Sequence, residues 1–165
     1  MKPRQTSFTK TATIYRSEKF ISVEALSGAS ALKYRENGGH GVYLEPETND
    51  QALGQALLAA LDRSRFVDPR SERAFFDPER AARVYADWQK DFMRRYGYKT
   101  KREAFRNLDW CYARMSDGKI SIEPHRRDKP GSWRGLPPDR TVIIPTTDGP
   151  AAVGAALRVA LDRCE

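Results

Sequence analysis

The sequence predicts an α+β fold built from two βββα halves, related by an approximate two-fold axis, with helices packed on antiparallel sheet and a central helix connecting the halves. A helix-like segment occurs twice, as Gln51–Arg65 and as Ala151–Glu165, with identical residues at eight of fifteen positions. Chance matching would give roughly one such identity. A strand-like segment, Ile21–Glu24 (ISVE), also returns 99 positions later as Ile120–Glu123 (ISIE). Two unrelated Ala/Leu helices would not explain this second match in the same order, so we favour an internal duplication.

Length and composition are those of one domain. With 165 residues, of which 39% are hydrophobic, the chain can bury a core. We expect a single domain over residues 1–165, with a first half at 1–65, a helical connector at 66–106 and a second half at 107–165. The net charge is +7, and residues 65–106 supply +5 of it, from twelve basic and seven acidic residues. This excess indicates either an acidic partner, such as nucleic acid, or a solvated arginine-rich helix face.

Alternating apolar and polar residues predict the strands of the first half. The expected strands are Thr9–Arg16, Lys19–Leu26, a weaker strand at Ala31–Arg35, and Val42–Leu44. Asn49 or Asp50 then caps the first repeated helix. Gly54 lies inside this helix and Gly154 inside its copy. Because glycine in a helix costs roughly 1 kcal/mol relative to alanine, we expect each glycine to permit a close approach between helix and sheet.

The connector contains the longest predicted helix, Pro78–Tyr96. Asp77 is a good capping residue, Pro78 suits the first helical position, and Gly97 is a typical terminator. Aromatic residues recur along this helix at three- and four-residue intervals, which predicts a stripe buried on the core shared by the two halves. Thr100 opens a short helical piece through residue 106, because Glu103 completes a capping box.

The second half begins with a hairpin. Its strands are Asp109–Ser116 and Lys119–His125, joined by Asp117-Gly118, a pair typical of type I′ turns. A sixteen-residue loop, His125–Arg140, follows, and loops of this length in a compact domain are usually functional or disordered. Thr141–Ile144 is the last predicted strand before the second repeated helix.

No pattern indicates a catalytic centre, a metal site or a cofactor. His40 and His125 lack metal-ligand spacing. Cys111 fits a core strand and Cys164 a helix end, which favours reduced thiols in a cytosolic protein and leaves a disulfide across the halves as the alternative. The N-terminus does not resemble a signal peptide, and no apolar run reaches membrane-spanning length. We expect a non-enzymatic, cytoplasmic protein.

Two surface features are candidates for binding. The first is the basic tract Lys90–Arg106, where cations alternate with Tyr96, Tyr98 and Phe105, as in sites that hold single-stranded nucleic acid through phosphate contacts and base stacking. If these aromatic side chains are buried instead, the cations only keep the helix solvated. The candidate residues for binding RNA or DNA are Arg94, Arg95, Lys99, Lys101 and Arg102.

The second feature is the loop His125–Arg140. An exposed Trp133 among arginines matches the residue types enriched at the energetic hot spots of protein interfaces. In the alternative, Trp133 folds back and covers the sheet. The candidate residues for binding a protein partner are Trp133, Arg126, Arg127, Asp128 and Arg134.

Six blocks of sequence, in order along nearly the whole chain, carry a family resemblance. The blocks are SFTKT (7–11), SRF (64–66), FFD (75–77), RYGYKTKRE (95–103), GKISIEP (118–124) and GAALRVALDRC (154–164). Together they resemble CdiI, the family of immunity proteins of bacterial contact-dependent growth inhibition (CDI) systems.

The resemblance implies a non-catalytic cytoplasmic protein that binds and neutralises the C-terminal toxin domain of a cognate CdiA effector, commonly a nuclease. The family has no catalytic residues to transfer, and its toxin contacts vary between members. A nuclease inhibitor is expected to be acidic, because the toxin's substrate groove is basic. This basic chain must therefore use local acids such as Glu45, Glu47 and Asp50, or cover an acidic surface of the toxin. Nucleic acid is the less favoured partner.

Overall fold

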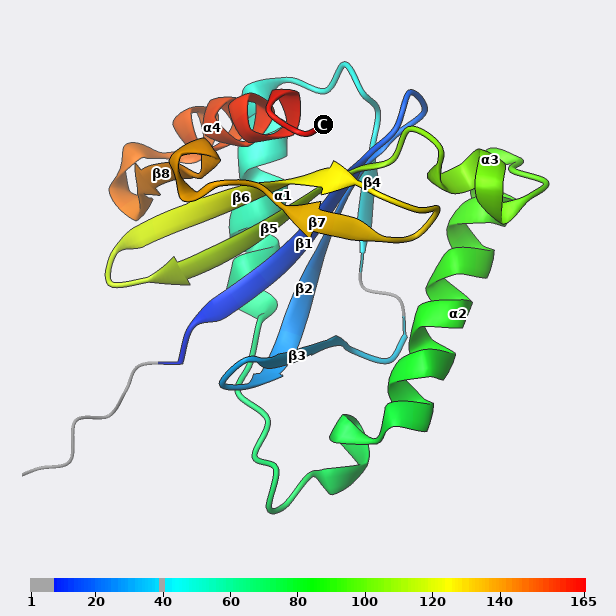
Figure 1. Ribbon diagram of the computed structural model, residues 1–165. Coiled ribbons are helices and arrows are strands. Elements are labelled where there is room, and N and C mark those ends of the chain that lie inside the picture. The colour runs from blue at the N-terminus through cyan, green and yellow to red at the C-terminus, as the bar shows by residue number, and fades with distance from the viewer. Residues whose placement is uncertain (1–7, 39–40) are drawn as a thin grey trace, which may run out of the picture.

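The computed structural model describes residues 8–38 and 41–165, so His40 and the first seven residues lie outside the described part of the chain. The described strands form one curled antiparallel sheet in the order β3-β2-β1-β5-β6-β7, while β4 pairs with β2 and β8 pairs with β6 (Figure 1). The strands are β1 (Lys10–Arg16), β2 (Ile21–Ala29), β3 (Leu32–Arg35), β4 (Val42–Leu44), β5 (Asp109–Ser116), β6 (Lys119–Arg127), β7 (Trp133–Gly135) and β8 (Val142–Pro145). The α-helices are α1 (Asp50–Arg63), α2 (Pro78–Tyr96), α3 (Lys101–Phe105) and α4 (Pro150–Asp162). The predicted α+β class and antiparallel sheet are confirmed.

The hairpin of β5 and β6 has the predicted turn. Asp117 and Gly118 both have left-handed backbone, with φ of 53° and 74°, as a type I′ turn requires. The register that follows pairs Met115 with Ile120 and Ala113 with Ile122. Because side chains alternate along a strand, the two isoleucines are buried on the same face of the sheet.

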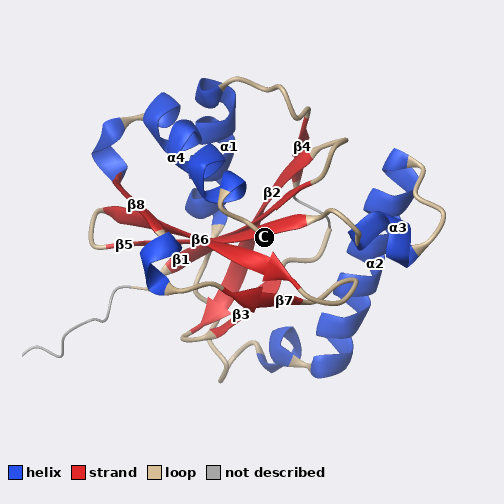
Figure 2. Ribbon diagram, turned by 45° about the horizontal axis from the view of Figure 1, so that its top comes forward, coloured by secondary structure: helices blue, strands red, loops and turns tan. Residues whose placement is uncertain are grey.

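Helices α1 and α4 lie side by side on that face (Figures 1 and 2). Asn49 caps α1 by accepting a hydrogen bond from the backbone of Ala52 at 2.8 Å. The helices and the sheet enclose a core of aliphatic side chains, here called the aliphatic core. Its fully buried members include Ile14, Ile21, Val23, Leu53, Leu57, Leu61, Ile120, Ile122, Val153, Leu157 and Leu161.

The two helix glycines are found where α1 and α4 meet. A Cβ on Gly54 would lie 1.7 Å from the carbonyl oxygen of Pro150, and a Cβ on Gly154 would lie 1.8 Å from that of Asp50. The prediction of a close approach is confirmed, but the predicted partner is wrong: the approach is between the two helices rather than between helix and sheet. Any side chain at either position would separate the helix backbones.

Helix α2 covers the opposite face of the sheet (Figure 2). Asp77 caps it by accepting from Glu79 at 3.0 Å, and Gly97 ends it with a left-handed φ of 72°. With the sheet and α3 it encloses a second core, here called the aromatic core. This core contains Tyr15, Phe20, Phe92, Tyr98, Phe105 and Leu108, with Trp88, Tyr96, Trp110 and Trp133 packed against it.

The sequence predicted that the aromatic stripe of α2 packs on the core shared by the two repeated helices. This prediction is wrong, because the stripe packs on the other face of the sheet. Ile14 belongs to the aliphatic core and its neighbour Tyr15 to the aromatic core. Successive residues of a strand point to opposite faces, so the sheet itself separates the two cores.

The sixteen-residue loop His125–Arg140 is largely structured, and its description as a loop is wrong. β6 continues to Arg127, and β7 returns beside it after a turn closed by a 2.8 Å hydrogen bond from the backbone of Ser132 to that of Lys129. A 3₁₀ turn over Pro138–Arg140 precedes β8. A strand of three residues is too short to show alternation, so sequence periodicity could not reveal it. Among the described residues, no helix combines the length and hydropathy needed to cross a membrane.

Candidate functional site

The β6–β7 hairpin holds all five candidate residues for protein binding. Arg126 pairs with Arg134 across the hairpin, and Arg127 pairs with Trp133. Residues directly opposite each other in an antiparallel pair share a face, and neighbours along the strand point to opposite faces. Arg126 and Arg134 therefore lie on the outer face of the hairpin, while Arg127 and Trp133 lie on the inner face.

Trp133 on the inner face is part of the aromatic core. Its indole Nε1 donates a 2.9 Å hydrogen bond to the carbonyl oxygen of Leu108. Its ring lies 5.5 Å from that of Tyr15, 5.7 Å from that of Trp110 and 6.0 Å from that of Phe105. The predicted exposure of Trp133 is wrong, and the alternative, that Trp133 folds back on the sheet, is the one observed. Its contact with a partner stays a prediction. A partly buried indole with its N–H satisfied is a structural support for the hairpin.

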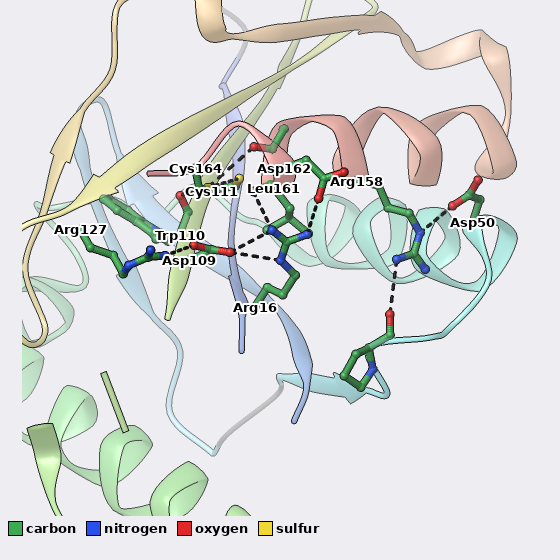
Figure 3. A network of polar contacts seen from close by, with 12 residues as sticks. Arg16, Asp50, Asp109, Trp110, Cys111, Arg127, Arg158, Leu161, Asp162 and Cys164 are labelled. Carbon is green, nitrogen blue, oxygen red and sulfur yellow. Dashed lines mark hydrogen bonds and ion pairs between the residues drawn. The ribbon is translucent and has the colours of Figure 1, made fainter. Parts of the chain in front are cut away.

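Arg127 on the inner face enters a network of ion pairs (Figure 3). Its guanidinium binds Asp109, whose other carboxylate oxygen accepts a 2.9 Å hydrogen bond from Arg16. Arg16 also donates to the carboxylate of Asp162 at 2.7 Å and to the carbonyl oxygen of Leu161 at 2.9 Å. Burial alone would lower the pKa of Arg16, but the hydrogen bonds to Asp162 and Asp109 outweigh it and raise the pKa. The network thus ties the end of β6 to β1, β5 and the C-terminal end of α4.

The outer face of the hairpin carries the exposed charges. Arg126 donates to the Glu165 carboxylate at 2.8 Å, and Arg140 binds the other oxygen of that carboxylate at 3.0 Å. Arg134, whose side chain is 72% exposed, lies 3.3 Å from the carboxylate of Asp128. The hydrogen bond from Arg126 lowers the pKa of Glu165. The outer face is thus a mixed-charge surface with arginine in excess.

Sequence reasoning missed Glu165 and Arg140. Glu165 reaches the hairpin because its backbone pairs with β6: its N–H donates to His125 at 3.2 Å, and its carbonyl accepts from Arg127 at 2.7 Å. Glu165 and Arg126 are separated by 39 positions in the chain. No local pattern could have linked them.

The two cysteines meet beside this network. The Sγ atoms of Cys111 and Cys164 are 3.6 Å apart, and both thiols are free. The prediction of reduced cysteines is confirmed. Burial raises the pKa of Cys111, whereas the hydrogen bond from Cys111 lowers the pKa of Cys164. In the described part of the chain, no group of three His, Cys, Asp or Glu side chains could hold a metal ion.

The basic tract presents cations without the aromatic platform that base stacking needs. Tyr98 and Phe105 are buried in the aromatic core, and the ring of Tyr96 stacks on Phe20 at 4.6 Å. Arg94 and Arg95 both bind Asp91, at 3.0 Å and 3.6 Å. The other three candidates, Lys99, Lys101 and Arg102, are exposed in and before α3. The rings are thus turned into the aromatic core or stacked on it, as in the alternative offered by the sequence, and nucleic-acid binding by the five cations stays a prediction.

The fold and this surface are those of an α+β protein whose exposed charges lie on a well-supported hairpin, an arrangement suited to contact with another protein. The CdiI model of the CDI immunity protein family matches residues 10–164. The chain therefore belongs to the CDI immunity protein family.

Individual relatives agree with this membership. Immunity protein CdiI-YPIII of Yersinia pseudotuberculosis serotype O:3 (strain YPIII) is 33% identical over 172 residues, covering 93% of this chain and 94% of the relative. A chain of the solved CdiA-CT/CdiI toxin and immunity complex from Yersinia pseudotuberculosis superposes with a TM-score of 0.90 at 30% identity, covering 96% of this chain and 98% of that chain. A protein of unknown function from Neisseria meningitidis superposes equally well, with a TM-score of 0.90 at 28% identity and 96% coverage of both chains.

Proposed function

We propose that this chain is an immunity protein that binds the C-terminal toxin domain of a cognate CdiA effector and neutralises it by forming a protein–protein complex. The observation that carries the proposal is the likeness to a chain of a CdiA-CT/CdiI toxin and immunity complex, with a TM-score of 0.90 over 96% of this chain. The family match over residues 10–164 supports the same function. The chain would act by covering the toxin and not by catalysis, and it would do so in the cytoplasm. The nuclease activity expected of the toxin stays a prediction.

The outer face of the β6–β7 hairpin is our proposed contact surface. Arg126, Asp128 and Arg134 would meet the toxin directly, and Arg127 and Trp133 would hold the hairpin in place from its inner face. Charge pairs at an interface supply discrimination between partners and raise the association rate. The mixed signs on this face, with Asp128 and Glu165 among arginines, suit a toxin surface of complementary mixed charge.

We also propose that the chain is one domain formed by internal duplication, with halves at 1–65 and 107–165. The register of the two hairpins supports this: Ala12 pairs with Ala25, and Cys111 pairs with Pro124, each 99 positions later. The mutual contact of Gly54 and Gly154 supports it as well. In this proposal the two copies face each other across β1 and β5, the central pair of the sheet.

Titration calorimetry with the cognate CdiA C-terminal toxin domain tests the function and the surface together. Wild-type chain should bind at a ratio of one to one, and its expression should protect cells that express the toxin. Replacing Arg126 and Arg134 by alanine should weaken binding about tenfold or more. A matched control removes two other exposed arginines, Arg102 and Arg106, and should leave affinity unchanged.

Absence of binding and of protection by the wild-type chain would overturn the proposed function. Equal affinities of the two double variants would overturn only the hairpin surface.

A further inference from the structure

A cavity of about 450 Å³ opens between α2 and the sheet at β1, β2 and β4. It lies where α2 passes over this edge of the sheet. The lining side chains that matter here are Tyr15, Ser22, Tyr43, Asp87, Trp88 and Asp91. The volume is enough for one or two large side chains of a partner.

The charge of the cavity is opposite to that of the protein. Four carboxylates line it (Glu24, Glu36, Asp87 and Asp91) against two guanidinium groups (Arg35 and Arg83), whereas the whole chain carries +7. Within the cavity, the Arg35 guanidinium is already paired with Glu24 at 2.6 Å. Glu36 is paired with Arg65 at 2.6 Å and Asp91 with Arg94 and Arg95. Of the four carboxylates, Asp87 is therefore the one that the described residues leave for a cation that enters from outside.

Asp87 is the carboxylate best placed to receive that cation. It forms no ion pair within the described residues, while Asp91 is shared by the exposed Arg94 and Arg95. Asp87 and Asp91 are four positions apart on α2, so they lie on one face of the helix and repel each other. A cation bound between them would relieve this repulsion.

Ser22 supplies a hydroxyl group that faces the cavity. The residue is 5% exposed and lines the cavity, and its hydroxyl makes no hydrogen bond within the part of the chain that the structure describes, while its oxygen stays accessible. The hydroxyl is therefore available to a group that enters the cavity. Ser22 pairs with Tyr15 on one side and with Tyr43 on the other. Burial, followed by the charges of Asp91 and Glu24, raises the pKa of Tyr43 to about 12, so its phenol stays protonated in a negative environment.

The aromatic walls already bind guanidinium groups of the chain itself. Arg35 lies 4.1 Å from the centre of the Trp88 ring, and Arg95 lies 4.4 Å from that of Tyr43. Stacking of a planar guanidinium on an aromatic face is favourable, and arginine does this better than lysine. The chemistry of the walls therefore fits arginine.

We propose that this cavity receives an arginine side chain of the toxin, with Asp87 and Asp91 as counter-charges and the hydroxyl groups of Ser22 and Tyr43 as hydrogen-bond partners. The inference rests on the proposed function and names the chemistry of one contact. It would also let a basic immunity protein engage a toxin that is expected to be basic, because the local charge of the cavity, and not the net charge, meets the partner.

The test compares four proteins in titration calorimetry with the cognate CdiA C-terminal toxin domain. Asp87→Asn removes the counter-charge and should weaken binding about tenfold. Arg83→Gln removes the opposing cation at the cavity and should tighten binding about threefold. Asp117→Asn is the matched control, since it removes the same charge from the exposed type I′ turn, where asparagine is favoured. Its affinity should equal that of the wild type.

Salt dependence provides a readout that a purely structural effect would not change. Wild-type binding should weaken as salt rises, and Asp87→Asn should weaken less steeply. If the wild type binds the toxin but Asp87→Asn and Asp117→Asn have equal affinities, the cavity does not receive a cation and the inference is wrong. If the wild type itself does not bind, it is the proposed function that fails.

Discussion

The two faces of the sheet are covered by different kinds of side chain, aliphatic on one face and aromatic on the other. The aliphatic core is closed by α1 and α4, whose backbones touch at Gly54 and Gly154. The aromatic core lies under α2, where a cavity of about 450 Å³ remains. Small and branched side chains pack without gaps. Large aromatic side chains under a single long helix leave space between them. One face thus fixes the fold, and the other has space for a partner.

The largest difference between the faces should come from Gly54→Ala. The added Cβ would lie 1.7 Å from a backbone oxygen, so α1 and α4 must move apart, at a cost of about 4 kcal/mol. Urea unfolding of the variant measures this. Gln55→Ala, an exposed change in the same helix, is the control and should be nearly neutral. A loss below about 1 kcal/mol for Gly54→Ala would mean that the aliphatic face is not tightly closed.

Glu24→Ala should produce the next largest effect, on the aromatic face. It leaves Arg35 unpaired, although the side chains of this ion pair are only 10% and 11% exposed. Breaking such a pair costs about 3 kcal/mol. The double variant Glu24→Leu with Arg35→Met should recover most of this stability, because apolar groups need no partner. If the double variant is no more stable than Glu24→Ala, packing and not charge explains the loss.

Enlarging a side chain should distinguish the two faces most directly. Ala160 has no free space beside it in the aliphatic core, so Ala160→Leu should lower the free energy of unfolding by about 2 kcal/mol. Val84 lines the cavity, so the larger side chain of Val84→Leu has room and should change the free energy of unfolding by less than about 0.5 kcal/mol. Thermal unfolding of the two variants gives the comparison. Equal losses would show that the cavity closes in solution.

The smallest expected effect concerns pH. Burial would raise the pKa of Glu36 at the cavity, but hydrogen bonds from Arg65 and Ser27 outweigh it and lower the pKa below its ordinary value of 4.5. A carboxyl with a lowered pKa in the folded state stabilises the fold above that ordinary value, and the contribution is lost as pH falls through the folded-state pKa. The difference in melting temperature between wild type and Glu36→Gln should therefore shrink below about pH 4.5. A constant difference from pH 7 to pH 3 would contradict the shift.

Local signals in the sequence determined most of the secondary structure. Asp77, Pro78 and Gly97 placed α2 correctly, and Asp117-Gly118 placed the β5–β6 turn, because capping and turn geometry depend on neighbouring residues only. β7 escaped detection because three residues show no periodicity. The resemblance in six blocks was enough to indicate the CDI immunity protein family.

Only the tertiary structure decided which faces meet and which charges are free. A glycine in a helix predicts a close approach, but the sequence cannot say whether a sheet or a second helix approaches. The sequence leaves open whether Trp133 is an interface anchor or a core residue. The folded structure decides, because its N–H donates to the carbonyl oxygen of Leu108, far away in the chain. The aromatic residues of the basic tract, the pairing of Glu165 with Arg126 and the unpaired hydroxyl of Ser22 depend in the same way on groups brought together by folding. Burial and ion pairing are properties of distant neighbours, so no local pattern encodes them.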